Sequence, residues 1–264
     1  MTFHYSGSWG SDGSYSLAND LEDANTVLDF ILQDETYGFD KRHIYAVGHS
    51  MGGFVCGQLA AHRPEIKRAV LLMPCDIGRL PQIARENPAA YGIIQEVLED
   101  SAQWLSDTSG EALLREALDR SADFRLESAA GALAQKPVLC IAGTLDIYTP
   151  PPLHCEPLIR AVHAVGGTSL QGIRYPTDHF FADYRLTVVE AVTAFLMKQR
   201  SEGWICKSYP PQNGCLSLIK EAARRHSHSS HAAVRCMQHL SADMQTHRRF
   251  RNSSSTPFHF SGYS

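Results

Sequence analysis

The sequence lacks several features that would assign it to a specialised class of protein. It has no run of about eighteen apolar residues, the length that a membrane-spanning helix needs. Residues 1–13 contain no basic start followed by an apolar stretch, as a secretory signal would. Charge of one sign does not dominate, since the net charge is -4 and 20% of the residues are charged. We therefore expect no membrane and no nucleic acid as partner, whereas small neutral substrates remain open.

Cysteine pairs are also missing from the sequence. The seven cysteines are odd in number, and none of them forms a CxxC motif. This pattern argues against a framework of disulfides and against a zinc site. A reducing compartment fits best, and we expect the protein in the cytoplasm.

The apolar residues that are present predict an α/β fold. At 264 residues and 44% hydrophobic composition, the chain can bury a core. Near-continuous apolar runs are typical of parallel strands that are covered on both faces. Strands are predicted at 2–5, 43–47, 68–73, 137–142 and 169–175. Helices are predicted between and after them at 21–32, 51–61, 153–165 and 184–198. The alternation favours a mostly parallel sheet flanked by helices.

Two segments depart from this alternation. Residues 75–135 show helical stretches, such as 93–105 and 111–118, without strand alternation, and they predict a helical lid insert within a domain at 1–200. Residues 201–264 contain eight basic against three acidic residues, together with clusters of serine and histidine. Because this segment lacks apolar periodicity, we expect a poorly ordered basic tail.

The run Gly48-His49-Ser50-Met51-Gly52-Gly53 carries the strongest chemical signal. A Gly-x-Ser-x-Gly pattern is weak alone, but here it follows a predicted strand and opens a predicted helix, as a nucleophile elbow does. Gly48 and Gly52 would prevent clashes in the tight turn, which holds Ser50 at positive φ. Met51 N–H would face a developing oxyanion. The alternative is a glycine-rich turn with an idle serine.

An acid and a histidine follow in suitable places. A serine hydroxyl needs a base to take its proton, and the base needs a carboxylate to orient it. Asp146 and His179 each come just after a predicted strand, at the sheet edge where functional groups gather in α/β proteins. The order Ser50, Asp146, His179 matches that of a Ser-Asp-His triad.

Other acids and histidines are weaker candidates. Asp76 follows the strand at 68–73 and is the alternative acid. Asp178 adjoins His179 but would point away from it. His49 is expected to flank the pocket or pack beneath it, and His154 is expected to be structural.

Four segments, 5–13, 48–53, 142–146 and 178–180, together resemble the α/β-hydrolase superfamily, nearest its cinnamoyl-esterase-like and serine-aminopeptidase-like branches. The resemblance extends over residues 2–199. It implies an eight-stranded, mostly parallel sheet with helices on both sides. It also implies a lid after the strand at 68–73, which the segment 75–135 fits.

The chain departs from the family pattern at its start. The family's counterpart of residues 5–13 follows its fourth strand, so the resemblance implies that the first strands are absent here. The His-Gly loop that supplies a second oxyanion donor would be absent with them, and such a donor is typically worth about 100- to 1,000-fold in turnover. Our hypothesis is an incomplete gene model or a truncated paralogue.

Together these features predict a serine hydrolase that cleaves small carboxylic esters through an acyl-enzyme, without a metal or organic cofactor. Ser50 would attack, His179 would act as base, and Asp146 would orient the imidazole. An aminopeptidase-like peptidase and a catalytically impaired binding paralogue are the alternatives.

Overall fold

A sheet of four parallel strands forms the centre of the fold. The computed structural model describes residues 1–198. Its strands lie side by side in sequence order: β1 (Ile44–His49), β2 (Ile66–Leu72), β3 (Val138–Gly143) and β4 (Leu170–Tyr175). Every residue of β3 and most of β2 are buried, which explains why their sequences are apolar without alternation. The four apolar runs at 43–47, 68–73, 137–142 and 169–175 thus predicted the sheet.

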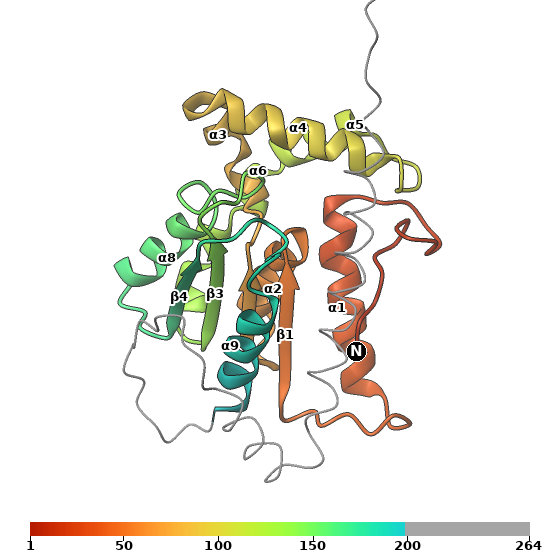
Figure 1. Cartoon of the computed structure of the whole chain (residues 1–264). Coiled ribbons are helices and arrows are strands. Elements are labelled where there is room, and N and C mark those ends of the chain that lie inside the picture. Colours follow the sequence, from red (N-terminus) through yellow and green to blue (C-terminus); the bar gives the residue numbers. More distant parts are fainter. Residues whose placement is uncertain (199–264) are drawn as a thin grey trace, which may run out of the picture. The chain divides into compact units, whose positions relative to one another are not determined.

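Helices cover the sheet. The main ones are α1 (Leu17–Gln33), α2 (Met51–His62), α8 (Cys155–Ala164) and α9 (Arg185–Met197). Helix α2 packs against β1 and β2 and also against α1, whereas α8 packs against β4. Figure 1 shows α9 on the opposite face of the sheet from α2. Strand connections through helices of this kind are what parallel neighbours require.

Arg68 fastens the last helix to the sheet. Its guanidinium donates hydrogen bonds from β2 to the carbonyl oxygens of Phe195, Leu196 and Lys198. The carbonyl groups of a final helical turn have no partners within the helix and carry partial negative charge. A guanidinium at this place therefore satisfies the end of α9 and ties it to β2.

The segment that joins β2 to β3 contains only helices among the described residues. These are η1 (Ile77–Arg79), α3 (Leu80–Glu86), α4 (Pro88–Ala102), α5 (Gly110–Asp119), α6 (Ser121–Phe124), η2 (Leu126–Ala129) and α7 (Ala130–Leu133). Helices α3, α4 and α5 lie beyond the carboxyl ends of the strands (Figure 1), whereas η2 and α7 return to pack against α2. Helix α4 begins five residues before the helix predicted at 93–105, because Asn87 caps it and Pro88 occupies its first turn.

The N-terminal segment is bonded to these helices. The Glu116 carboxylate of α5 accepts hydrogen bonds from the N–H groups of Leu17 and Ala18, each at 2.9 Å. A carboxylate at a helix N-terminus satisfies orphan donors and complements the helix dipole. Ser106 N–H also donates to Gly7 O at 2.8 Å. Helix α1 and the insert therefore support one another.

One expectation about the sheet needs correction. The strand predicted at 2–5 is wrong: this segment forms no strand, and Ser6 N–H and Oγ next to it bond to the Asp23 carboxylate of α1. The family has eight strands and the resemblance implied that the first ones are absent here; residues 1–198 contain four parallel strands, with β1 pairing there only with β2. The basic tail predicted at 201–264 lies outside the described residues. No helix among residues 1–198 is long and apolar enough to cross a membrane.

Phe54 tests how far the core beneath α2 stabilises the fold. Its side chain is fully buried and meets Phe124 edge-on at 5.8 Å between ring centroids. Phe54→Ala should lower the free energy of unfolding by about 3–5 kcal/mol, because it leaves a cavity that the packed core cannot close. Leu186→Ala, at a side chain 79% exposed, should change it by less than about 0.5 kcal/mol. Urea unfolding measures both, and equal effects would contradict this account of the core.

Candidate active site

Ser50 occupies a strained turn between β1 and α2. Its backbone lies at φ 55° and ψ -116°, outside the regions that side-chain-bearing residues prefer. The turn is held by hydrogen bonds: Ser50 N–H donates to Leu72 O at 2.9 Å, and Ser50 O accepts from the N–H groups of Gly53 and Cys75, each at 3.0 Å. Strain of this kind persists only where the surroundings over-determine it, and it gathers at functional sites. The geometry is that of a nucleophile elbow.

The elbow can be this tight because Gly48 has no side chain. A Cβ on Gly48 would lie 1.9 Å from Gly52 O, a distance that no real contact allows. The steric need expected at Gly52 itself is not found among the described residues, since a Cβ there would meet only Tyr5 Oη at 4.0 Å. Gly53 is the second tight position, because its Cβ would lie 2.9 Å from Pro74 Cα.

The structure brings Asp146 and His179 together. Asp146 Oδ2 lies 2.7 Å from His179 Nδ1, and the two residues are only 4% and 7% exposed. The same carboxylate accepts the Thr149 hydroxyl at 2.6 Å on Oδ2 and the N–H groups of Tyr148 and Thr149, at 2.8 and 3.0 Å, on Oδ1. Four donors thus surround one buried carboxylate.

These donors decide the ionisation state of Asp146. Burial acts to raise its pKa, but the hydrogen bond and charge of His179 and the hydrogen bonds from Thr149 outweigh burial, so its pKa lies below the usual value. The carboxylate is therefore charged near neutral pH. A charged carboxylate at Nδ1 keeps the proton of a neutral imidazole on that nitrogen and leaves Nε2 free to accept one.

Aromatic neighbours hold the His179 ring from other sides. His49 Nε2 lies 2.8 Å from the backbone oxygen of His179, and the two rings are 4.7 Å apart. The Tyr148 ring meets His179 edge-on at 5.3 Å. His49 therefore packs beside His179.

The three candidate residues are not fully joined in this structure. Among residues 1–198, no hydrogen bond links the Ser50 hydroxyl to His179. Ser50 and Met51 are both partly exposed, so the hydroxyl is open to a ligand. Catalytic hydrogen bonds are often long in unliganded enzymes and tighten when substrate binds. Met51 is the first residue of α2, where a backbone N–H has no acceptor within the helix.

The alternative acid, Asp76, lies in a different environment. It is fully buried, accepts one hydrogen bond, from Leu126 N–H at 3.2 Å, and its Oδ2 has no partner in the described part of the chain. Burial raises the pKa of Asp76 to about 7, so Asp76 keeps its proton up to a higher pH than Asp146 does. His154 contacts it, accepting Asp76 N–H on Nδ1 at 3.1 Å, and burial lowers the His154 pKa to about 4. Asp146, not Asp76, pairs with His179.

The Asp178 carboxylate bonds to the backbone that follows His179. Asp178 Oδ1 accepts the N–H groups of Phe180 and Ala182, each at 3.1 Å, so this carboxylate shapes the turn after His179.

Residues 1–198 contain no group of three or more His, Cys, Asp or Glu side chains placed to hold a metal ion.

Thr149 is the residue that the sequence reasoning missed. Its hydroxyl contacts Asp146, Met73 O at 3.2 Å and His179 Nδ1 at 3.4 Å, and so joins the ends of β2 and β3 to the histidine. A signal was present, since an aspartate often accepts the N–H groups of the residues two and three positions later. Met73 itself lies at φ 44°, a second strained residue beside the site.

Comparison with known proteins identifies the family. A model described as "Alpha/beta hydrolase family" matches residues 3–206, most of the chain. The chain therefore belongs to the alpha/beta hydrolase family. A search of curated protein sequences found no similar relative.

Solved structures share the fold at low sequence identity. The Pyrococcus furiosus esterase Pf2001 matches with a TM-score of 0.50 and 14% identity, covering 71% of this chain and 65% of that one. An enol-lactonase from Burkholderia xenovorans LB400 has a TM-score of 0.48 and 18% identity, over 74% and 79% of the two chains. Est1E from Butyrivibrio proteoclasticus has a TM-score of 0.48 and 23% identity, over 69% and 70%. At 14% identity the likeness to the esterase Pf2001 speaks for the fold alone.

Gly48 and Gly52 form a matched pair for testing the elbow. Gly48→Ala forces a methyl group into the Gly52 carbonyl and should destabilise the chain by about 3 kcal/mol or more, since backbone on both sides must shift. Gly52→Ala meets no close atom and lies in α2, so it should be neutral or stabilising by up to about 1 kcal/mol. Thermal or urea unfolding of both variants checks the difference, and equal losses would refute the steric account.

Asp76 makes the stability of the chain depend on pH. The pKa of Asp76 is about 7 in the folded chain, whereas an ordinary carboxyl group of an unfolded chain has a pKa of about 4. Between these two pH values the folded chain keeps a proton on Asp76 that the unfolded chain has lost. Asp76 therefore costs the folded state about 1.4 kcal/mol more per pH unit as the pH rises between these values. Asp76→Asn should remove this change of the unfolding free energy with pH, and urea unfolding at several pH values between the two pKa values measures it. The exposed substitution Asp119→Asn should follow the wild type, and parallel curves for Asp76→Asn would disprove the assignment.

Proposed function

We propose that this chain is a serine hydrolase that cleaves carboxylic esters of small molecules. The observation that carries the proposal is the 2.7 Å contact between Asp146 and His179, buried beside a serine in a strained elbow. A nucleophile, a base and a group that orients the base are the parts that acyl transfer through a serine needs.

The first step follows from the state of the imidazole. With Nδ1–H donated to Asp146, His179 Nε2 is unprotonated and can take the proton from Ser50 Oγ as the oxygen attacks the ester carbonyl. The imidazolium that forms is stabilised by the buried carboxylate, whose own hydrogen bonds from Thr149 and Tyr148 keep it in place. The same imidazolium then protonates the leaving alcohol. Water, activated by His179, releases the acid from the acyl-enzyme.

The oxyanion is stabilised through Met51. Its N–H stands at the start of α2, where the helix dipole favours negative charge. Ser50 N–H is already bound to Leu72 O and is not available for this role. A donor of this kind is typically worth about 100- to 1,000-fold in turnover.

Exposed apolar side chains beside the site favour an ester with an apolar acyl group. Leu145 and Ile147 flank Asp146 and are 63% and 54% exposed. Trp9 and Trp104 stack at 6.4 Å, one from the N-terminal segment and one from the turn between α4 and α5. We propose that residues 75–135 act as a lid that selects the acyl chain. The cytoplasm is the compartment we propose, on the pattern of the cysteines.

A catalytically impaired binding protein is the rival candidate. The missing hydrogen bond between Ser50 and His179 among residues 1–198 favours it. Such a protein would retain the pocket but would not activate Ser50. An activated serine is therefore what distinguishes the two functions.

A fluorophosphonate probe, which reacts with activated serines, separates these candidates. The full chain should be labelled, and Ser50→Ala should abolish labelling because no other serine of the described chain stands at an elbow. Ser101→Ala, an exposed serine on α4, is the matched control and should label like the wild type. Absence of labelling in the wild type, or labelling that survives Ser50→Ala, would rule out the serine hydrolase. Comparing aryl esters with arylamides of alanine and proline then decides between esterase and peptidase.

A further inference from the structure

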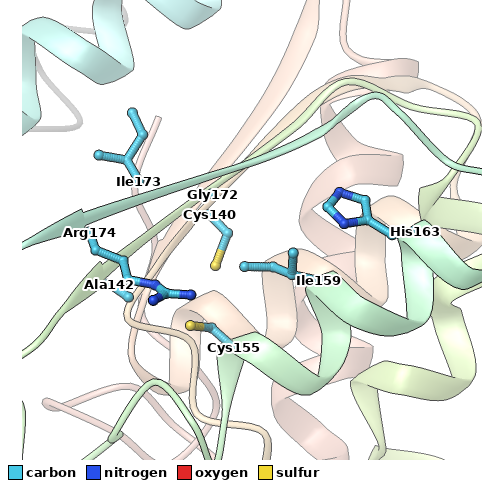
Figure 2. A pocket seen from close by; sticks show the side chains of 8 residues that line it. All are labelled: Cys140, Ala142, Cys155, Ile159, His163, Gly172, Ile173 and Arg174. Carbon is cyan, nitrogen blue, oxygen red and sulfur yellow. The ribbon is translucent and has the colours of Figure 1, made fainter. Parts of the chain in front are cut away.

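A cavity lies between α8 and the strands β3 and β4. Its volume is about 340 Å³, within the range of about 300–1,000 Å³ that small-molecule sites have. Figure 2 shows the sulfur atoms of Cys140 and Cys155 and the side chains of His163 and Arg174 on its lining. The lining residues that matter here are Cys140, Cys155, Ile159, His163, Gly172 and Arg174.

Two thiols line the same cavity. Cys140 comes from the middle of β3, Cys155 opens α8, and their sulfur atoms lie near one another in Figure 2. The Cys155 thiol donates a hydrogen bond to Pro151 O at 3.7 Å. Both residues are buried and unbridged. Two adjacent thiols at a cavity are the arrangement from which a disulfide forms.

The two sulfur atoms are not equivalent. The neighbouring residue Cys155, and then burial, raise the pKa of Cys140 well above its ordinary value. Cys155 occupies the first turn of α8, where a helix favours negative charge. Cys155 is therefore the sulfur that can attack a reagent, and Cys140 is the one that can follow.

Gly172 leaves the cavity open to the outside. This residue of β4 is exposed, and a Cβ on it would meet only the flexible end of Ile159, at 3.1 Å. His163 is exposed, and the Arg174 side chain is 58% exposed. Glu156 pairs with Arg174 at 3.2 Å and also with Arg160 at 3.6 Å, so the rim retains an excess of positive charge. Such a rim suits a reagent that carries carboxylates.

We infer that Cys155 and Cys140 form a redox-active dithiol, which a small anionic disulfide oxidises after entering this cavity. The Cys155 thiol gives its proton to water, and its sulfur attacks one sulfur of the reagent. The reagent's S–S bond breaks, and one thiolate leaves and takes up a proton. Cys140 then loses its proton and attacks Cys155, which releases the second thiol. Two cysteine thiols are oxidised and one disulfide is reduced to two thiols.

Glutathione disulfide is the probe that tests this inference on the reduced full chain. Peptide mapping by mass spectrometry should find a disulfide between Cys140 and Cys155. Cys140→Ser should stop at a glutathione adduct on Cys155, and Cys155→Ser should give neither product. Gly172→Val fills the cavity with a side chain that strands favour and should slow oxidation roughly tenfold, since access limits the exchange rate. Gly92→Ala, which adds a methyl group in open space on α4, should leave the rate unchanged.

Three results would overturn the inference. The peptide map of the oxidised wild-type chain does not depend on the folding of any variant. Absence of a disulfide between Cys140 and Cys155 in this map would refute the inference. An adduct on Cys56 or Cys75 in place of Cys155 in the Cys140→Ser chain would show that the cavity does not direct the reagent. Equal oxidation rates for Gly172→Val and the wild type would show that the reagent enters elsewhere.

Discussion

The close approach of the Gly52 carbonyl to Gly48 is the contact on which the rest of the site depends. Because Gly48 has no Cβ, β1 turns directly into α2 within one residue, and Ser50 stands alone at the apex. The Ser50 amide then reaches Leu72 O, which fixes the apex to β2. Since β2 lies beside β3, the loop that carries Asp146 follows at the same edge. The positions of all three candidate residues thus follow from one missing side chain.

The number of donors around a carboxylate decides what it can do here. Asp146 and Asp76 are both buried and both follow a strand end, so sequence position alone does not distinguish them. Asp146 receives four hydrogen bonds and stays charged. Asp76 receives one on its carboxylate and holds its proton near neutral pH. Burial opposes charge in both cases, and the local donors set the outcome.

The sequence predicted the parts of the fold whose burial imposes a pattern. Strands β1 to β4 lie within two residues of their predicted ranges, and in β2 and β3 burial on both faces demands the apolar runs. The strand at 2–5 failed because β-propensity does not say whether a partner strand is present. The meeting of Asp146 with His179 followed from the shared edge of parallel strands. The contacts of the Thr149 hydroxyl with Met73 and His179 and the close approach of Gly53 to Pro74 were missed, because both join residues far apart in the sequence.

The order of the sheet has a consequence for how the substrate range of such a chain can change. Strands β2 and β3 are direct parallel neighbours, and Met73 N–H donates to Ile141 O at 2.7 Å, so contacts within the sheet fix their register, while the helical segment between them leaves β2 at the carboxyl edge and enters β3 at the opposite edge. Insertions or deletions in α3, α4 and α5 leave that register unchanged. Evolution can therefore change the helices of this segment, and with them the lid that we propose, without changing the sheet that carries the site.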